Sequence, residues 1–361
     1  MKHWDYVNLR YKEFYYLANR PISRKVYAED LHLTINWEKG EKHMRELDVL
    51  DFCGSYYEIG LAHGRKLIKS EHFQNILSNI KGNSFLKQNT EEIRSVLKYF
   101  CPQLLDELEG LQEGTGYPEN DVLRLFGGYD MPLLEMGCTS FITSDYYVRN
   151  YDFSPYIYDG TFIVQRHDEN NWICGNSELM LGRLDGMNHN GLACGIHFVN
   201  NNPNKKGFIG SAIVRIILEM WKNVEEAIAL LQELPHAASY NYSLIDRNED
   251  FAIFEASPYE TNICRERESL SCVNIFQTSK METYNRKNVD SSLDRLEALS
   301  QSSKSLKHVS DVHIWFSDQT SPVFYTDYKH FFGTLHTVSY VPKASKIILT
   351  SPGGKAQEIL L

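Results

Sequence analysis

The sequence predicts an α+β fold in which antiparallel sheets are covered by layers of helices. Strand-like runs occur in adjacent pairs along the chain, and helical stretches are grouped between these pairs. The regular strand–helix–strand alternation of a parallel sheet is missing. The chain has 361 residues, of which 42% are hydrophobic and 23% charged, so its length suits two domains or one large domain with a substantial core.

The part of the chain before residue 137 is predicted to be mostly helical, because apolar residues recur there at helical spacing. Gly60 and Gly64 weaken the first helix. Thr90 suits the N-cap of the second, and Pro102 suits the first turn of the third. The four predicted helices cover residues 56–70, 89–100, 103–114 and 118–125.

The strand-rich part of the chain begins near Gly137. Residues 139–143 and 146–150 are joined by Ser144 and Asp145, and they predict a β-hairpin whose first residue is Cys138. Further strands are predicted at 161–165, 192–199, 240–245, 251–255, 271–276, 323–328, 335–340 and 346–349. Helices between these strands are predicted at 209–221, 224–234, 293–299 and 309–315.

Charge and composition exclude several classes of protein. Lys and Arg number 37 and Asp and Glu number 47, and the resulting net charge of −10 disfavours binding to nucleic acid. The N-terminus lacks the apolar core of a signal peptide, and no run approaches about 18 apolar residues, so we expect a cytoplasmic protein without membrane association. Seven cysteines without a CxxC pair fit reduced thiols better than disulfides.

Cys138 is the cysteine with the most informative neighbourhood. An isolated cysteine at the start of a strand is usually a small buried apolar residue. Here the second strand of the hairpin carries Arg149 and Asp152, which can come near the start of the first strand. A cation favours the thiolate, and a carboxylate can hold a protonated amine, so the three groups together suit nucleophilic chemistry.

Six motifs in a fixed order carry a family resemblance. They are Gly-Ser-Tyr-Tyr-Glu-Ile-Gly at 54–60 with Ala-His-Gly at 62–64, Leu-Glu-Gly at 108–110 with Glu-Gly-Thr-Gly at 113–116, Gly-Cys-Thr-Ser-Phe at 137–141 with Arg-Asn-Tyr-Asp at 149–152, Asp-Gly-Met-Asn at 185–188 with Gly-Leu at 191–192, Phe-Glu-Ala-Ser-Pro at 254–258, and Val-Asn at 273–274. Each is weak alone. Together they resemble the acyl-coenzyme A:6-aminopenicillanate (isopenicillin N) acyltransferase family of N-terminal-nucleophile cysteine hydrolases, relatives of choloylglycine hydrolase and penicillin V acylase.

The resemblance implies an αββα sandwich of two stacked antiparallel sheets between helical layers. It also implies that the protein cuts its own Gly137–Cys138 bond, so that a mostly helical segment 1–137 and a catalytic segment 138–361 form one intertwined domain. Glycine permits the backbone angles that bring a thiolate to the preceding carbonyl. The released α-amine of Cys138, with a reference pKa of about 7.7 to 8.0, can accept the thiol proton.

The family's functional residues transfer to matching positions of this chain. Cys138 is then the nucleophile, Asp152 and Arg149 orient its amine and sulfur, and Asn274 is an oxyanion donor. The second donor of relatives is an asparagine, and the matching position here is His197. The alternatives to His197 are a backbone N–H and the asparagines at 200–202. Arg295 resembles a family arginine near the active site, although the residue type also suits a solvated helix charge.

The expected function is cleavage or transfer of an acyl group at an amide, or at a coenzyme A thioester, through an S-acyl-Cys138 intermediate. The partner is a small N-acyl amide or acyl-coenzyme A substrate, and the chain is compatible with a homo-oligomer. No cofactor or metal is expected, because no HExxH, P-loop or GxGxxG motif occurs. A serine-hydrolase nucleophile is not supported either, because no GxSxG motif occurs. The alternative is an unprocessed, non-catalytic member of the fold that acts as a binding protein.

Overall fold

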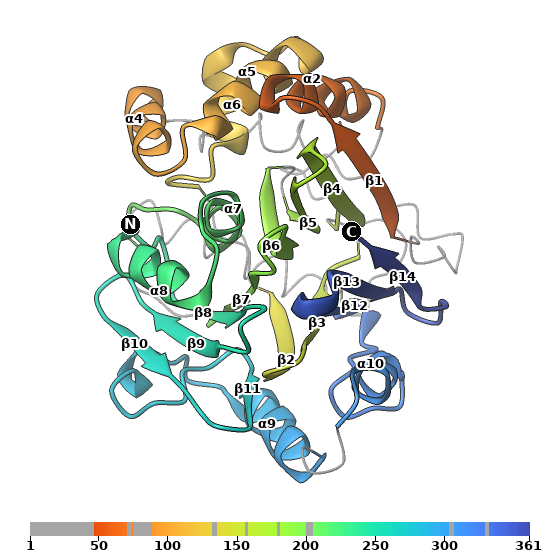
Figure 1. The fold of residues 1–361 in the computed structure, drawn as a ribbon. Coiled ribbons are helices and arrows are strands. Elements are labelled where there is room, and N and C mark those ends of the chain that lie inside the picture. Colours follow the sequence, from red (N-terminus) through yellow and green to blue (C-terminus); the bar gives the residue numbers. More distant parts are fainter. Residues whose placement is uncertain are drawn as a thin grey trace, which may run out of the picture.

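The computed structural model describes residues 47–70, 74, 88–131, 136–155, 158–178, 181–199, 205–302, 307–328 and 332–361. These residues form two stacked sheets with helices on their outer faces (Figure 1). The predicted α+β class and αββα layering are therefore confirmed. None of the helices in these ranges is long and apolar enough to cross a membrane.

The larger sheet has eight strands in the order β1-β4-β5-β6-β7-β8-β9-β10. Its neighbours are antiparallel except for β1 and β4, which run parallel. The strands are β1 (Asp48–Cys53), β4 (Thr161–Asp168), β5 (Asn171–Glu178), β6 (Gly182–Asn188), β7 (Ala193–Phe198), β8 (Tyr240–Ile245), β9 (Phe251–Ala256) and β10 (Thr261–Cys264).

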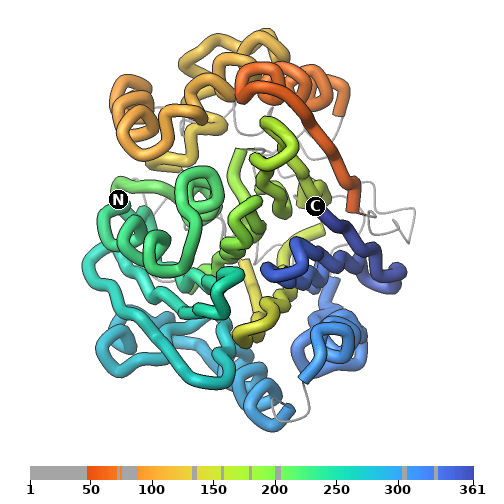
Figure 2. Tube along the Cα trace, viewed as in Figure 1, coloured from red at the N-terminus to blue at the C-terminus, as the bar shows by residue number. Residues whose placement is uncertain are grey.

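The smaller sheet has six strands in the order β11-β2-β3-β12-β13-β14, all antiparallel to their neighbours. They are β11 (Ser269–Cys272), β2 (Gly137–Thr143), β3 (Tyr147–Phe153), β12 (Gly333–Val341), β13 (Lys346–Thr350) and β14 (Gln357–Leu360). The predicted hairpin of β2 and β3 lies inside this sheet. Figure 2 shows that β3 runs beside β12, which follows it by about half the chain.

Helices cover the outer faces of both sheets and form a separate group at one end (Figure 1). Helices α7 and α8 pack on the larger sheet, whereas α9 and α10 pack on the smaller one. The end group consists of helices that precede Cys138 in the chain. The bounds are α2 (Tyr56–Leu67), α4 (Thr90–Phe100), α5 (Gln103–Thr115), α6 (Glu119–Phe126), α7 (Gly210–Met220), α8 (Val224–Glu233), α9 (Asp290–Ser302) and α10 (Val309–Ser317).

The facing sides of the two sheets share a core. Ile142 and Val338 of the smaller sheet join one buried cluster with Val164 and Met187 of the larger sheet. Close packing of such apolar side chains is a main source of stability, and it fixes how far apart the sheets lie. Polar side chains that enter this layer are therefore excluded from solvent.

Glycines explain the first two sequence motifs. Helices α2 and α5 cross so closely that a Cβ at Gly60 would lie 2.0 Å from the carbonyl oxygen of Glu107. A Cβ at Gly110 would lie 1.9 Å from the carbonyl oxygen of Tyr57, so neither position can accept a side chain. A Cβ at Gly64 would likewise lie 2.8 Å from the carbonyl oxygen of Leu111, so the two glycines that weaken the prediction of the first helix form its contact surface with α5.

Several predicted elements differ from the structure. Strands β1, β5, β6, β10 and β14 were not predicted. In β5 and β6, buried polar residues and glycines hide the strand pattern. The strand predicted at 323–328 is wrong, since residues 324–327 have no regular structure. The strand predicted at 271–276 ends at Cys272, because side chains rather than a neighbouring strand bind the backbone after it.

Candidate active site

Cys138 lies at the second position of β2, between the two sheets, and its side chain is fully buried. Arg149 donates from Nη2 to the Cys138 sulfur across 3.0 Å. Burial raises the pKa of the thiol to about 12, even though the Arg149 and Arg295 charges act in the opposite direction. In the uncut chain Cys138 is therefore a protonated thiol with a cation in contact.

The guanidinium of Arg149 is held from the opposite sheet. Its Nη1 lies 2.5 Å from Asp185 Oδ2 in β6, and Nη2 also donates to the carbonyl oxygen of Ile196 in β7 at 2.8 Å. Asp185 Oδ1 in turn accepts from Asn176 at 2.7 Å and from Tyr340 at 2.6 Å. Burial acts to raise the pKa of Asp185, but the Arg149 charge holds it well below its usual range, so the pair is ionised.

Asp152 lies directly across the hairpin from Gly137. Its Oδ1 accepts from Thr334 Oγ1 at 2.7 Å, while its Oδ2 lies 3.7 Å from Arg295 Nη1 and accepts no hydrogen bond from a described residue. Burial raises the pKa of this carboxyl, and the Arg295 charge opposes that effect. Asp152 thus offers a free oxygen near the backbone of position 137.

Gly137 leaves space in the uncut chain that a side chain would fill. Its φ is outside the left-handed region in which other glycines of the chain lie. A Cβ at this position would lie 2.5 Å from the Phe332 ring, 3.1 Å from Asp152 Cβ and 3.3 Å from Asp152 Oδ2. In the uncut chain, glycine at this position thus allows the close approach of the hairpin and the Phe332 ring.

Asn274 binds the backbone on both sides of Gly137. Its Oδ1 accepts from the Cys138 amide at 2.9 Å, and its Nδ2 donates to Met136 O at 3.3 Å and to Phe198 O at 2.9 Å. The side chain is 1% exposed. It is placed so that its amide faces the candidate scissile bond.

Arg295 is buried rather than solvated, so the reading as a surface helix charge is wrong. From α9 it donates through Nη1 to Cys138 O at 2.7 Å and to Thr139 Oγ1 at 2.6 Å, and through Nη2 to Asn274 Oδ1 at 3.1 Å. Its contacts join Cys138, Asn274 and Asp152. The structure thus brings five of the six predicted side chains into one bonded cluster.

His197, the sixth, lies in β7 beside this cluster and is fully buried. Burial and the charges of Arg149 and Arg295 lower its pKa well below the usual value, so the ring is neutral. Neither ring nitrogen makes a hydrogen bond of ordinary geometry with a described residue, although the Asn241 backbone is close enough to favour the protonated ring. The alternative donors at 200–202 lie outside the described residues.

Sequence reasoning missed Asp185 and Thr334 as members of the cluster. Asp185 stands in a motif that carried the resemblance, and its carboxylate beside a glycine in a strand was a usable signal. No sequence signal marked Thr334, because it reaches Asp152 from β12, which is distant in the sequence. Among the described side chains no group of three or more His, Cys, Asp or Glu is arranged to hold a metal ion.

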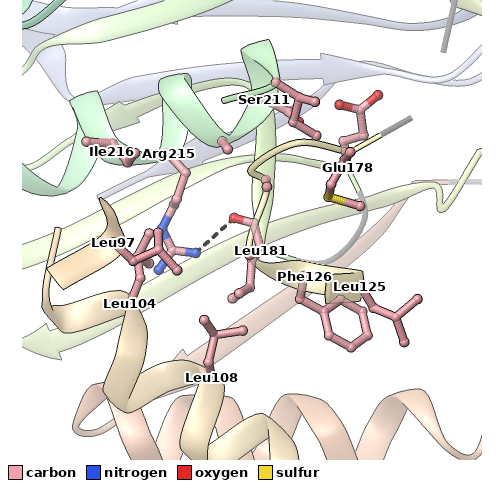
Figure 3. Close-up of a pocket in the computed structure, with 16 residues that line it drawn as sticks. Leu97, Leu104, Leu108, Leu125, Phe126, Glu178, Leu181, Ser211, Arg215 and Ile216 are labelled. Carbon is pink, nitrogen blue, oxygen red and sulfur yellow. Dashed lines mark hydrogen bonds between the residues drawn. The ribbon is translucent and has the colours of Figure 1, made fainter. Parts of the chain in front are cut away.

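A small apolar cavity lies apart from the cluster, between the end helices and α7 (Figure 3). Leu97, Leu104 and Leu108 line it from one side. Glu178 and Ser211 line it as well, and burial raises the pKa of Glu178 to about 7. None of the side chains bonded around Cys138 lines this cavity.

Comparison with protein families gives one match. The model described as "Acyl-coenzyme A:6-aminopenicillanic acid acyl-transferase" matches residues 142–356, which is more than half of the chain. The match includes Arg149, Asp152, Asn274 and Arg295, and it begins just after Cys138. No curated protein sequence matches this chain.

Solved structures give matches with low identity. A mutant of the conjugated bile acid hydrolase from Clostridium perfringens is 11% identical with a TM-score of 0.43, over 63% of this chain and 92% of that one. Penicillin V acylase from Agrobacterium tumefaciens is 15% identical with a TM-score of 0.36, over 62% and 86%. A Caenorhabditis elegans ortholog of N-acylethanolamine-hydrolyzing acid amidase is 13% identical with a TM-score of 0.37, over 57% and 93%. At these scores the likenesses carry no weight for the chemistry.

Proposed function

The chain belongs to the acyl-coenzyme A:6-aminopenicillanic acid acyl-transferase family, and on that premise we propose that it cleaves or transfers an acyl group through an S-acyl-Cys138 intermediate. One observation carries the proposal. The Cys138 sulfur contacts Arg149, while the Cys138 backbone binds Asn274 through its amide and Arg295 through its carbonyl. A cation at the sulfur favours the thiolate, which is the form that attacks an acyl group.

Activation begins with cleavage of the Gly137–Cys138 bond. The Cys138 sulfur attacks the carbonyl carbon of Gly137, the carbon–nitrogen bond breaks, and the sulfur's proton passes to the departing nitrogen. Water then hydrolyses the resulting thioester, which gives a Gly137 carboxylate and restores the Cys138 thiol beside a free α-amine. Arg149 supports the first step because a cation at the sulfur favours the thiolate.

The new α-amine has a partner in Asp152. The carboxyl oxygen Oδ2 accepts no hydrogen bond from a described residue and lies beside position 137. An α-amine titrates near pH 7.7 to 8.0 in reference peptides, so it is available as a base at neutral pH. Held by Asp152, it takes the thiol proton when the sulfur attacks a substrate and returns it to the leaving group.

Asn274 supports the charge that develops on the substrate. In the uncut chain one of its N–H groups donates to Met136 O. Once the segment before Cys138 withdraws, that donor is free for the oxyanion of the tetrahedral intermediate. Neutral His197 is the candidate second donor, since an imidazole with an unpaired N–H can serve as the amide of relatives does.

The substrate class follows from the family and from the chemistry of the acyl-cysteine. An acyl group enters from a linear amide or from a coenzyme A thioester. Water as acceptor makes the protein an amidohydrolase, and an amine as acceptor makes it an acyltransferase. We favour hydrolysis of a small N-acylated compound.

Intact-mass spectrometry of the purified chain tests activation. Fragments ending at Gly137 and beginning at Cys138 are expected, and the Cys138→Ala variant should stay whole. Cys101→Ala is the matched control, because Cys101 is an equally buried thiol outside the cluster.

A panel of phenylacetyl, fatty-acyl and N-acyl-amino-acid amides tests turnover through the acid released. A chain that stays at full length and releases no acid would favour the non-catalytic binding protein. Turnover by Cys138→Ala would remove Cys138 from the mechanism.

A further inference from the structure

The segment that carries Asn274 follows β11 without regular secondary structure. Asn241 in β8 holds this segment on both sides of Asn274. Its Nδ2 donates to the carbonyl oxygen of Val273 at 3.0 Å and to that of Ile275 at 2.8 Å. Because an amide nitrogen has two hydrogens, both donors of Asn241 are committed to the two neighbours of Asn274.

Glu255, the register partner of Asn241 in β9, holds the same segment farther along. Its Oε1 accepts from the backbone amides of Gln277 at 2.6 Å and Thr278 at 3.3 Å. Backbone groups buried outside a helix or sheet need partners of this kind. Two adjacent strands of the larger sheet therefore fix the path of the segment, and Asn241 fixes the part next to Asn274.

The remaining polar atom of the Asn241 side chain is its amide oxygen. The side chain is fully buried, and Oδ1 has no hydrogen-bond partner among the described residues. Leaving a buried amide oxygen unpaired costs free energy that an apolar side chain of similar size would avoid. The two bonds to the Asn274 segment are thus the contribution of this amide to the structure.

We propose that Asn241 is a positioning residue that aims the Asn274 side chain at the backbone amide of Cys138. The Asn274–Cys138 bond is 2.9 Å long and lies at the candidate scissile peptide. A shift of the segment by a fraction of an ångström would lengthen this bond and misplace the oxyanion donor. The expected loss of turnover rests on the proposed function, whereas the expected lengthening of the Asn274–Cys138 hydrogen bond does not.

Hydrogen exchange tests the geometry without any catalysis. In a Cys138→Ala chain, which stays whole, the amide of position 138 donates to Asn274. Adding Asn241→Ala is expected to speed exchange of that amide by about tenfold or more, since its acceptor is no longer held. Asn241→Leu, which fills the space, should do the same and keeps the test valid if the alanine variant folds poorly.

Asn188 provides the matched control. It is 1% exposed, lies in β6, and donates from Nδ2 to the carbonyl oxygens of Leu218 at 2.9 Å and Trp221 at 2.7 Å. Asn188→Ala loses these two bonds and also the two that Oδ1 accepts from the amides of Asn190 and Leu192, all away from Asn274. It therefore reports the effect of lower global stability alone. Equal acceleration at position 138 in both variants, or none with Asn241→Ala, would overturn the proposal.

Turnover provides the second readout. With Cys138 present, Asn241→Ala should lower kcat and the rate of chain cleavage by about tenfold to a hundredfold with little change in KM. Asn188→Ala should leave both rates near wild type. If the wild-type chain proves inactive, the proposed function fails while the exchange experiment still decides the role of Asn241.

Discussion

Arg149 lies between Cys138 and Asp185, with Nη2 at 3.0 Å from the sulfur and Nη1 at 2.5 Å from the carboxylate. The candidate nucleophile and the arginine belong to the smaller sheet, whereas the carboxylate belongs to the larger one. The stacking of the sheets therefore sets the contact at the sulfur. Loss of either charge should affect both stability and chemistry.

Substitution of Arg149, alone and together with Asp185, should separate the effect on stability from the effect on chemistry. Arg149→Met leaves Asp185 as a buried charge without its cation, and we expect the free energy of unfolding in urea to fall by about 3 to 5 kcal/mol. Adding Asp185→Asn should restore most of that stability. Neither variant should cut the chain at Gly137–Cys138. A stable double variant that cleaves at the wild-type rate would contradict a role for Arg149 at the sulfur.

Asn274→Ala should lower turnover of a released-acid assay by about two to three orders of magnitude, because it removes a donor to the oxyanion. The KM for the amide should change far less than kcat. Intact-mass spectrometry would show slower chain cleavage in the same variant. Equal losses in kcat and in substrate affinity would instead indicate a binding role.

His197 should act as a neutral donor. His197→Phe is expected to lower kcat by about two to three orders of magnitude, while His197→Asn, which restores an amide donor, should retain most activity. Because burial holds the pKa of His197 well below its usual value, the ring should not titrate between pH 6 and 8 in rate profiles. Normal turnover by His197→Phe would assign the second donor to another group.

Arg215 should stabilise the contact between segments 1–137 and 138–361. It lies 2.5 Å from Glu107 of α5 and 2.6 Å from Glu219 of α7, and all three side chains are buried. Arg215→Met leaves two buried carboxylates without their cation, each with one remaining hydrogen bond, from Gln165 to Glu107 and from Tyr56 to Glu219. We therefore expect a loss of about 3 to 5 kcal/mol in urea unfolding and earlier separation of the cut segments during size-exclusion chromatography. Arg265→Ala, which breaks two solvent-accessible pairs, with Glu225 and with Asp250, should cost less, about 1 kcal/mol or below. Equal losses of stability in the Arg215→Met and Arg265→Ala variants would contradict a stabilising role for the buried ion pairs of Arg215.

Glu178 should make stability depend on pH. Burial raises its pKa from 4.5 to about 7, so the folded chain holds a proton that the unfolded chain releases above pH 4.5. The stability from this group is present below pH 4.5 and is lost as pH rises to about 7, by an amount on the order of 3 kcal/mol. Glu178→Gln should therefore match wild type at pH 4 and exceed it at pH 8 in unfolding experiments. A constant difference across this range would show that Glu178 does not titrate there.

The sequence by itself determined the layered α+β class, the hairpin that contains Cys138, and the residue types of the candidate site. These features are local or depend on motif order. Strand propensity and a two-residue turn predict the hairpin, and the hairpin alone brings Arg149 and Asp152 near Cys138. Helical periodicity likewise predicts the helices that precede Cys138.

Only the tertiary structure decided which partner each polar side chain has. The sequence left open whether Arg295 is a surface helix charge or a member of the site, and in the fold it reaches Cys138 across more than a hundred residues of sequence. Asp185 and Asn241 owe their roles to contacts between strands or segments that the sequence does not place side by side. Burial and pairing depend on distances through the folded core, and a buried charge is stable only where such a partner lies within reach.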